Sequence, residues 1–187
     1  NIKVGKNGVN LDLIKDEAKE SLKVDSLLLA IGVVANTQDL LSPKIKLEMD
    51  RGYITVNENY ESSVPEVYAA GDIIGPPWLA HVASAQGNLA AEHSAGLNVN
   101  PIDYSNIPGC TYCQPQVGSL GMTEQEALSS GFKVKVGRFS FQASGKAMAV
   151  GNTVGFVKLI FDEKYGELLG AHIVGSEATE MIAELGM

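Results

Sequence analysis

The sequence of 187 residues predicts an α/β region followed by an α+β region. Three observations support this fold class. The continuous apolar run 27–31 closes on Gly32, which is typical of a strand buried on both faces. Apolar residues then recur at helical spacing between residues 78 and 95. Beyond residue 109 the pattern changes to a strand, a helix, three strands and a final helix, which favours a sheet with helices packed on it.

The first region contains several short extended segments. Residues 2–24 alternate weakly around polar turn residues and predict short antiparallel strands. A turn at 50–52 precedes an alternating strand at 53–56, and a second short buried strand is expected at 67–70. For the run 27–31, a buried segment of helix is the alternative, because periodicity does not separate the two in short apolar runs.

The predicted helix at 78–95 has suitable residues at both ends. Pro77 suits the first turn, and Gly96 suits the position just past the end. The stretch 97–109 contains prolines and asparagines without periodicity, so it predicts a linker and a domain boundary.

The second region carries clear start and stop signals. Thr123 and Glu126 form a capping box, and Gly131 ends the short helix that follows. Strands are expected around residues 134–136, 153–161 and 168–175. Ser176 is expected to cap a last helix. One face of that helix is apolar and comprises Ala178, Met181, Ile182 and Leu185.

Composition excludes several classes of function. A net charge of −8 and a pI near 4.8 argue against a nucleic-acid partner, whose phosphates need a basic surface. Apolar runs are too short to span a membrane, and the first residues do not read as a signal peptide. Two cysteines do not make a disulfide framework, so a reducing, cytoplasmic location is expected. The chain starts without Met, which suggests a piece of a longer protein.

The stretch YAAGDIIGPPWLAH, residues 68–81, is the strongest candidate site. A strand that ends at Gly71 and Asp72 places a carboxylate at the edge of a sheet, where open α/β folds bind ligands. Gly71 permits close approach of the backbone, and Asp72 can accept hydrogen bonds from a hydroxyl-bearing chain such as a ribityl group. The start of the next helix offers free N–H groups. Asp72 as the cap of a simple turn is the alternative, and local chemistry leaves both open.

Several stretches resemble one enzyme family. SVPEVYAAGDIIGPPWLAHVASAQGNLAAE is similar to the second flavin-contacting segment of the pyridine nucleotide-disulfide oxidoreductases. LLLAIGVVANTQDL resembles the segment that closes their nicotinamide-dinucleotide domain. TYCQPQVGSLGMTEQEA and VGFVKLIFDEKYGELLGAHIVGSEATEMI resemble their interface domain. The resemblance covers nearly the whole chain in the family's order, and the Leu79-Ala80-His81 triplet is closest to the dihydrolipoamide dehydrogenase branch.

The resemblance implies a domain plan and a set of cofactor contacts. Residues 1–60 would end the NAD-binding domain and connect onward, 61–105 would supply the FAD-contacting strand and helix, and 106–187 would form an incomplete interface domain. The chain would thus hold the ends of two Rossmann-like domains and the dimerisation domain, truncated at both ends. The residues implied to contact FAD are Gly71, Asp72, Leu79, Ala80 and His81. Gly32 is implied to contact NAD.

Two departures from the family pattern affect these contacts. Residues 32–36 read Gly-Val-Val-Ala-Asn where the family has Gly-Arg-x-Pro-Asn, which removes the basis for side-chain contacts there. Trp78 stands where the family often has Met, although the contacts implied nearby are made by the backbone.

The chain lacks four parts that the family's chemistry needs. These are the Gly-x-Gly-x-x-Gly loop for FAD, a redox Cys-x4-Cys, a second glycine fingerprint for NAD, and a His-Glu base pair. No catalytic residue or metal ligand is therefore assigned, and the 187 residues alone are expected to be inactive. The resemblance implies that the intact protein oxidises dihydrolipoamide with FAD and NAD, forms a homodimer through residues 106–187, and serves a lipoyl-bearing multienzyme complex.

Three other functions fit parts of the sequence. Another family member, such as a glutathione or mercuric reductase, would share most of the motifs. A dimerisation module without chemistry would need only the second region. A ferredoxin or nitrite reductase would share the Gly-Asp segment, but the interface-like stretch 107–187 disfavours it.

The cysteines and histidines carry weaker signals. Cys110 and Cys113 form a C-x-x-C in an apparently extended stretch, where the two sulfurs point apart, so neither a redox pair nor a zinc site is expected. His81 is expected to contact the flavin or a carboxylate rather than act as a base. His93 is expected to be solvated, and His172 to be a hydrogen-bonded histidine of a sheet or interface.

Overall fold

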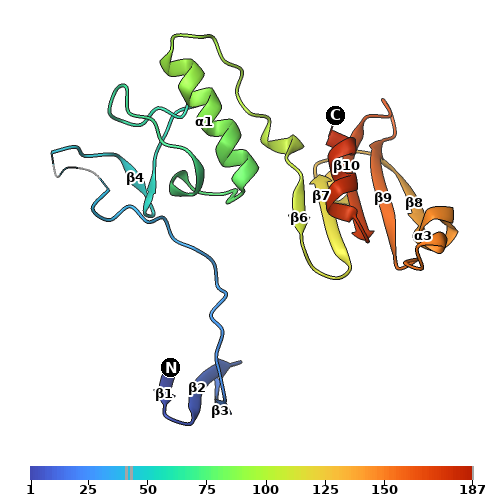
Figure 1. Cartoon of the computed structure of the whole chain (residues 1–187), viewed down its shortest axis with the longest axis horizontal. Coiled ribbons are helices and arrows are strands. Elements are labelled where there is room, and N and C mark those ends of the chain that lie inside the picture. Colours follow the sequence, from blue (N-terminus) through green and yellow to red (C-terminus); the bar gives the residue numbers. More distant parts are fainter. Residues whose placement is uncertain (41, 43, 187) are drawn as a thin grey trace.

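The computed structural model describes residues 1–40, 42 and 44–186. Its first element is an antiparallel sheet of β1 (Ile2–Gly5), β2 (Gly8–Lys15) and β3 (Ala18–Val24), in that spatial order (Figure 1). Asp16 and Glu17 connect β2 to β3, and both have positive φ, as a tight two-residue hairpin turn requires. The prediction of short antiparallel strands in residues 2–24 is confirmed.

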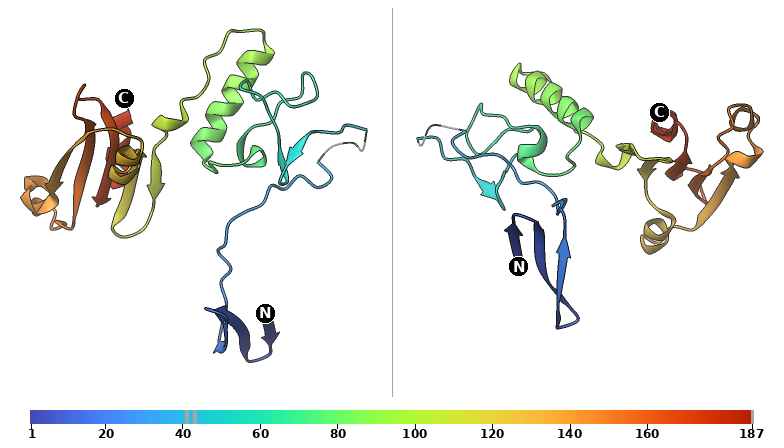
Figure 2. Two further views of the ribbon diagram at one scale, coloured as in Figure 1. Left: turned by 180° about the vertical axis from the view of Figure 1, so that it is seen from behind. Right: turned by 60° about the horizontal axis from the view of Figure 1, so that its bottom comes forward.

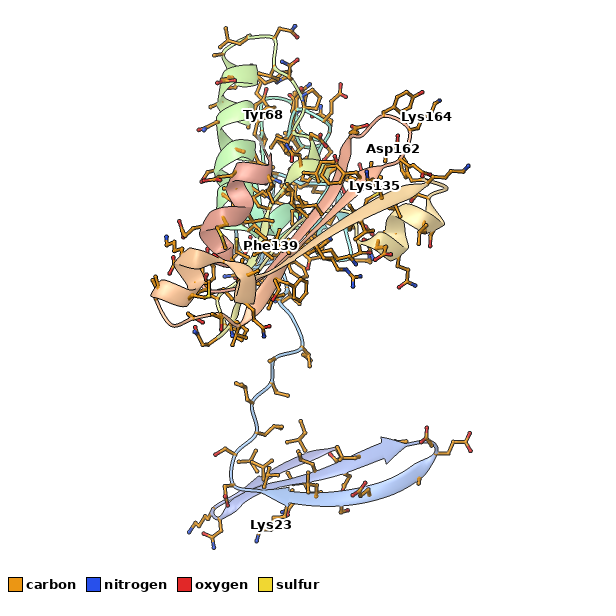
Figure 3. All side chains as sticks on the ribbon, turned by 90° about the vertical axis from the view of Figure 1, so that its right-hand side faces the viewer. Lys23, Tyr68, Lys135, Phe139, Asp162 and Lys164 are labelled. Atoms are coloured by element: carbon orange, nitrogen blue, oxygen red, sulfur yellow. The ribbon has the colours of Figure 1, made fainter. Side chains whose placement is uncertain are left out.

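The apolar run 27–31 does not form the predicted strand. It is extended and lies in water, with Leu28 87% and Ile31 93% exposed. A strand buried on both faces needs hydrogen-bonded neighbours, and no strand of the described residues pairs with this segment. Figure 3 shows the sheet of β1–β3 standing apart from the rest of the chain, joined to it by this segment alone.

The middle of the chain is built from short elements and turns. β4 (Met49–Asp50) and β5 (Tyr53–Ile54) form a hairpin around the predicted turn. The strand predicted at 53–56 stops at Ile54, because Val56 makes only a single bridge to Ser62. The prediction of a strand at 67–70 was wrong.

The backbone of residues 67–70 bonds to the preceding loop instead of to a sheet. Tyr68 makes one bridge to Glu61, and the N–H of Ala69 donates to the carbonyl of Tyr60 at 3.0 Å. The segment ends in the short 3-10 helix η1 (Gly71–Ile74).

The long helix α1 (Ala80–Ser94) confirms the prediction, with its start two residues later than expected. Its end depends on Gly96, which has a φ of +80°. The Gly96 N–H donates to the His93 carbonyl at 2.9 Å, and the Leu97 N–H donates to the Glu92 carbonyl at 3.1 Å. This is the Schellman arrangement, in which glycine adopts the left-handed conformation at low cost.

A small core lies between α1 and the preceding loops. Tyr60, Leu89 and Ala90 are buried in it, and Val99 and Ile102 pack against it from the stretch after the helix. Figure 1 shows this stretch leaving the far end of α1 and running back toward the second region. It ends in η2 (Tyr104–Asn106), where the Asp103 carboxylate accepts the N–H of Ser105.

The second region is a five-stranded antiparallel sheet. Its spatial order is β6-β7-β10-β9-β8. The strands are β6 (Gly109–Thr111), β7 (Gln116–Gly121), β8 (Val134–Ser140), β9 (Gly155–Asp162) and β10 (Leu168–Gly175). Strands β8, β9 and β10 confirm the strands predicted around residues 134–136, 153–161 and 168–175. The single strand predicted before the first helix is instead a pair, β6 and β7.

Three helical segments accompany the sheet. They are α2 (Glu124–Ser129), η3 (Phe141–Ala143) with α3 (Gly145–Ala149), and α4 (Ala178–Met181) continued by η4 (Ile182–Gly186). The predicted capping box of α2 is present. The segment 141–149 was not predicted as helical, although Ser144 caps α3 by accepting the N–H of Ala147.

The C-terminal helix covers one face of the sheet, as Figures 1 and 2 show. The buried core there comprises Leu120, Ala171, Ile173, Ala178 and Ile182. The predicted apolar face is therefore confirmed. The predicted cap at Ser176 was wrong, because Glu177 adopts a left-handed conformation (φ +59°) and α4 begins after it. Among the described residues, the helices are too short or too polar to cross a membrane.

Candidate functional site

The Gly71–Asp72 turn lies against the first turns of α1. Gly71 is buried with a φ of +79°, a conformation that favours glycine. A Cβ atom at this position would lie 3.2 Å from the Cβ of Ala83. Glycine is therefore required both by the backbone conformation and by the close approach of the helix.

Asp72 follows the buried glycine and is exposed. Its main-chain carbonyl accepts the N–H of Gly75 at 3.4 Å. Within the described part of the chain, the side-chain hydrogen bonds around the turn are made by Gln86, Tyr104 and Tyr60, and none of them reaches the carboxylate oxygens of Asp72. The carboxylate therefore does not cap the turn, and its lone pairs are available to a ligand.

The start of α1, which follows the Gly71–Asp72 turn in the chain, presents backbone N–H donors. Leu79 occupies the cap position in an extended conformation, and no side chain caps the helix. The first-turn N–H groups, which include those of Ala80 and His81, thus carry the positive end of the helix dipole into solvent. The side chain of His81 is exposed.

Behind the turn lies a buried hydrogen-bond network. Gln86 is only 2% exposed, and its Oε1 accepts the Gly71 N–H at 2.7 Å. Its Nε2 donates to the Tyr104 hydroxyl at 2.9 Å. That hydroxyl lies 2.8 Å from the hydroxyl of buried Tyr60. Burial and the bond to Tyr104 raise the pKa of Tyr60, so the Tyr60 hydroxyl stays protonated at neutral pH.

Sequence reasoning missed this network, although one signal was available. Gln86 falls four residues after Val82 and three before Leu89, and both of these are buried. A polar residue on the apolar face of a helix needs a buried hydrogen-bond partner. A local pattern does not reveal that partner, because Tyr104 lies 18 residues further along the chain.

A hollow of about 500 Å³ opens beside the turn. Tyr53, Ile74, Gly75 and Trp78 are among its lining residues. Trp78 stacks on Tyr53 with ring centres 6.4 Å apart. The Tyr53 hydroxyl lies 3.5 Å from the carbonyl of Val33, which connects the hollow to the extended segment that holds Gly32.

The structure thus brings together most of the predicted site residues. Gly71, Asp72 and the Leu79–His81 triplet lie around the start of α1. Gly32 lies in the extended segment with a φ of +114° and open space around it. Another hollow, of about 700 Å³, lies between η2 and the five-stranded sheet, and none of the predicted site residues lines it.

The other candidate residues have structural partners. His93 is half-buried and its Nδ1 lies 2.9 Å from the Tyr68 hydroxyl, so the prediction that it is solvated was wrong. The Nε2 of His172 lies 3.1 Å from the Met122 carbonyl, as expected for a hydrogen-bonded sheet histidine. Cys110 is half-buried and Cys113 is exposed, and both are free thiols. Among the described residues, no three His, Cys, Asp or Glu side chains gather in a metal-binding group.

Two family models match the chain. The model described as pyridine nucleotide-disulphide oxidoreductase matches residues 2–87. The model described as pyridine nucleotide-disulphide oxidoreductase, dimerisation domain, matches residues 107–187. The first match ends within α1 and the second begins just before the five-stranded sheet, so residues 88–106 lie between them.

The curated relatives that match the chain include several proteins named dihydrolipoyl dehydrogenase. A dihydrolipoyl dehydrogenase of Zymomonas mobilis is 52% identical over 156 residues, which is 83% of this chain and 34% of that protein. A dihydrolipoyl dehydrogenase of Chlorobaculum tepidum is 42% identical over 188 residues, which is 100% of this chain and 40% of that protein. The chain therefore spans a little over a third of the length of these relatives.

Solved structures have the same fold. LpdA of Mycobacterium tuberculosis superposes with a TM-score of 0.86 at 24% identity, over 99% of this chain and 40% of that one. The HOCl-induced flavoprotein disulfide reductase RclA of Escherichia coli, in its Cu(II) complex, gives a TM-score of 0.86 at 25% identity, over 100% of this chain and 42% of that one. These likenesses confirm the predicted fold class.

Proposed function

Because the chain belongs to the pyridine nucleotide-disulphide oxidoreductases, we propose that its Gly71–Asp72 turn and the start of α1 hold the FAD of a dihydrolipoyl dehydrogenase. Asp72 accepts hydrogen bonds from the ribityl hydroxyls. The N–H groups of Ala80 and His81 face the electron-rich side of the flavin ring, and Leu79, whose N–H donates to the Pro77 carbonyl at 3.0 Å, lies beside the ring at the cap position. The observation that carries this proposal is that Asp72 is exposed and that, among the described residues, its carboxylate accepts no hydrogen bond.

The residues present fit this cofactor. Gly71 has no Cβ, which lets the turn pack against Ala83 and brings Asp72 to the start of α1. The uncapped start of α1 supplies donors and a positive partial charge, which favour electron density on a bound ring. FAD supplies the electron-transfer chemistry when bound, and this part of the protein binds and orients it.

Gly32 is the proposed contact with NAD. Its positive φ and open surroundings permit a close approach of the dinucleotide to the backbone. Residues 33–36 depart from the family pattern, so the proposed contact is restricted to the main chain.

The activity of the whole protein is proposed from its relatives. Many curated relatives, at 38–52% identity, are named dihydrolipoyl dehydrogenase. We therefore propose that the intact protein oxidises dihydrolipoamide and reduces NAD, and that the 187 residues alone do not turn over. The likeness to RclA supports a second candidate, a flavoprotein disulfide reductase with a different substrate.

The match to the dimerisation domain supports assembly as a homodimer through residues 106–187. A lipoyl-bearing multienzyme complex as partner and a cytoplasmic location belong to the same proposal. The domain boundaries 1–60, 61–105 and 106–187 also stay predictions.

A hybrid protein tests the proposed function. In it, this chain replaces the matching segment of the Chlorobaculum tepidum relative, which aligns over the whole chain. The hybrid is expected to be yellow and to form NADH from dihydrolipoamide. Activity with glutathione disulfide but not with dihydrolipoamide would favour a different reductase.

The variant Asp72→Ala tests the carboxylate itself. It is expected to raise the dissociation constant for FAD about tenfold or more, since a hydrogen bond to a charged group is worth about 1.5–3 kcal/mol. Asp25→Ala removes an exposed carboxylate elsewhere and is the matched control. Equal FAD affinity in Asp72→Ala and Asp25→Ala would contradict the proposal.

A further inference from the structure

We infer that Gln86 and Tyr104 are positioning residues that hold the Gly71–Asp72 turn in the orientation needed for its flavin contact. This inference rests on the proposed function, because it assigns an indirect role at the same site. Neither side chain needs to touch the cofactor. They act through the backbone N–H of Gly71.

The first step is the bond between Gln86 and the turn. The Gly71 N–H is buried, and Gln86 Oε1 accepts it at 2.7 Å. This N–H belongs to the peptide unit that joins Ala70 to Gly71, so the bond fixes the chain where it enters the turn, one residue before Asp72. Gly71 has the freest backbone of any residue, and an external bond is what restricts it.

The second step is the bond between Gln86 and Tyr104. A primary amide has an acceptor end and a donor end, and the two can exchange by a flip of the side chain. The Tyr104 hydroxyl accepts from Nε2 at 2.9 Å and thereby keeps Oε1 directed at Gly71. The Tyr60 hydroxyl, 2.8 Å from that of Tyr104, completes a chain of three hydrogen bonds.

The burial of Gln86 argues against a purely structural role. In the part of residues 44–106 that the structure describes, it is the one buried side chain that is polar or charged other than the tyrosines. A buried amide costs free energy unless both ends are bonded, and an apolar side chain of similar size would fill the space. What the amide provides and an apolar side chain does not is the hydrogen bond to the Gly71 N–H.

Tyr104 adds a link to the second region. It belongs to η2, at the end of the stretch that connects α1 to the five-stranded sheet. In the same short element, Asn106 Nδ2 donates to the Gly186 carbonyl at 2.9 Å. The geometry of the turn therefore depends on a residue of the connection to the second region.

The test uses the hybrid protein described above, with four variants. Gln86→Met removes both hydrogen bonds and keeps the length of the side chain. Gln86→Glu keeps an oxygen that can accept the Gly71 N–H. Tyr104→Phe removes only a hydroxyl from a half-exposed ring. Gln116→Met is the matched control, because Gln116 also accepts a backbone N–H, that of Thr179, in the five-stranded sheet.

The readouts are the dissociation constant for FAD and the visible circular dichroism of the bound flavin. Gln86→Met is expected to raise the dissociation constant about tenfold and Tyr104→Phe about threefold, because a buried N–H or amide end loses its partner. Gln86→Glu is expected to stay near the unaltered hybrid, and Gln116→Met to equal it. Both weakened variants are expected to change the dichroism spectrum.

A double variant separates positioning from general destabilisation. If Gln86 acts through Asp72, Asp72→Ala combined with Gln86→Met binds FAD no more weakly than Asp72→Ala alone. Additive losses would overturn the inference, as would unaltered binding and dichroism in both Gln86→Met and Tyr104→Phe. Tyr104→Phe alone decides the matter if Gln86→Met does not fold. If Asp72→Ala itself has no effect, the proposed function fails, and the inference fails with it.

Discussion

Glu126 closes the start of α2 with its side chain. Its Oε2 accepts the N–H and the hydroxyl of Thr123, both at 2.8 Å. In return, the Thr123 hydroxyl oxygen accepts the Glu126 N–H at 3.2 Å. The bonds from the Thr123 N–H and hydroxyl favour the ionised carboxylate and lower the pKa of Glu126.

This cap makes stability depend on pH. Because the pKa is lower in the folded state than in the unfolded state, Glu126 stabilises the fold above the ordinary carboxyl pKa, and this stabilisation is lost as the pH falls through the folded value. The denaturant midpoint of the chain is therefore expected to fall between about pH 6 and about pH 3.

Glu126→Gln is expected to flatten this fall, since glutamine can still form the box but does not titrate. The measurement is denaturant unfolding at several pH values. Glu163→Gln, in the loop between β9 and β10, removes an equal charge away from the cap and is the control. The same pH dependence in the two variants would count against the cap as its source.

At the scale of residues, the sequence predicted what is local. Thr123, Glu126, Gly131 and Gly96 follow patterns that span only a few positions, and the structure confirms each of them. Gln86 and Tyr104 were missed because the contact depends on how the chain returns along α1.

At the scale of elements, the packing of α4 on β7 depends on one glycine. A Cβ atom on Gly118 would lie 2.6 Å from the carbonyl oxygen of Ala178 and 3.0 Å from the Cβ of Ile182. The helix can approach the sheet this closely only because the strand has no side chain at this point. Backbone cannot move aside as a flexible side chain can.

Gly118→Ala is expected to lower the free energy of unfolding by about 1–3 kcal/mol, the usual effect of overpacking. Gly137→Ala is the matched control, because Gly137 lies on β8 of the same sheet with open space around it. Denaturant unfolding of both variants provides the measurement. A loss no greater in Gly118→Ala than in Gly137→Ala would show that the helix can shift freely.

At the same scale, a predicted strand forms only where the chain supplies a neighbouring strand to pair with it. Strands β8, β9 and β10 were predicted, and each finds its neighbour within the chain, whereas the pair β6 and β7 was predicted as a single strand. The runs 27–31 and 67–70 have a strand-like composition without a partner strand among the described residues. Composition indicates that a segment suits a sheet, whereas the hydrogen-bonded neighbour decides whether a strand forms.

At the scale of the whole molecule, exposed apolar groups at the β8 edge favour association. Phe139, labelled in Figure 3, is 51% exposed there. Phe156 on the neighbouring strand β9 and Val154 just before it are also exposed. Exposed apolar surface of this kind marks an interaction site in soluble proteins.

Light scattering at micromolar concentration is expected to give twice the mass of one chain. Phe139→Lys is expected to shift the equilibrium toward the monomer, because a charge then has to be buried on association. Val4→Lys, at an 82% exposed position of the first sheet, is the control. A monomer mass for the unaltered chain would contradict association, and equal masses for the two variants would place the contact elsewhere.

Family and fold class were predicted at this scale because several motifs occur in the family's order along the chain, and the family matches confirm both. The residues of the candidate site came from the same resemblance. The structure adds what the motifs could not contain, which is the free carboxylate of Asp72 and the buried support behind it.

The turn at Gly96 sends the chain back beside the helix that it has just left (Figure 1). From residue 86 to residue 96 the helix advances about 15 Å, whereas the eight residue steps from 96 to 104 can reach at most about 27 Å. A return shortened by four residues would reach at most about 13 Å, so the backbone at Tyr104 could no longer come level with residue 86. The number of residues from 97 to 103, more than their identity, therefore sets where Tyr104 lies along α1.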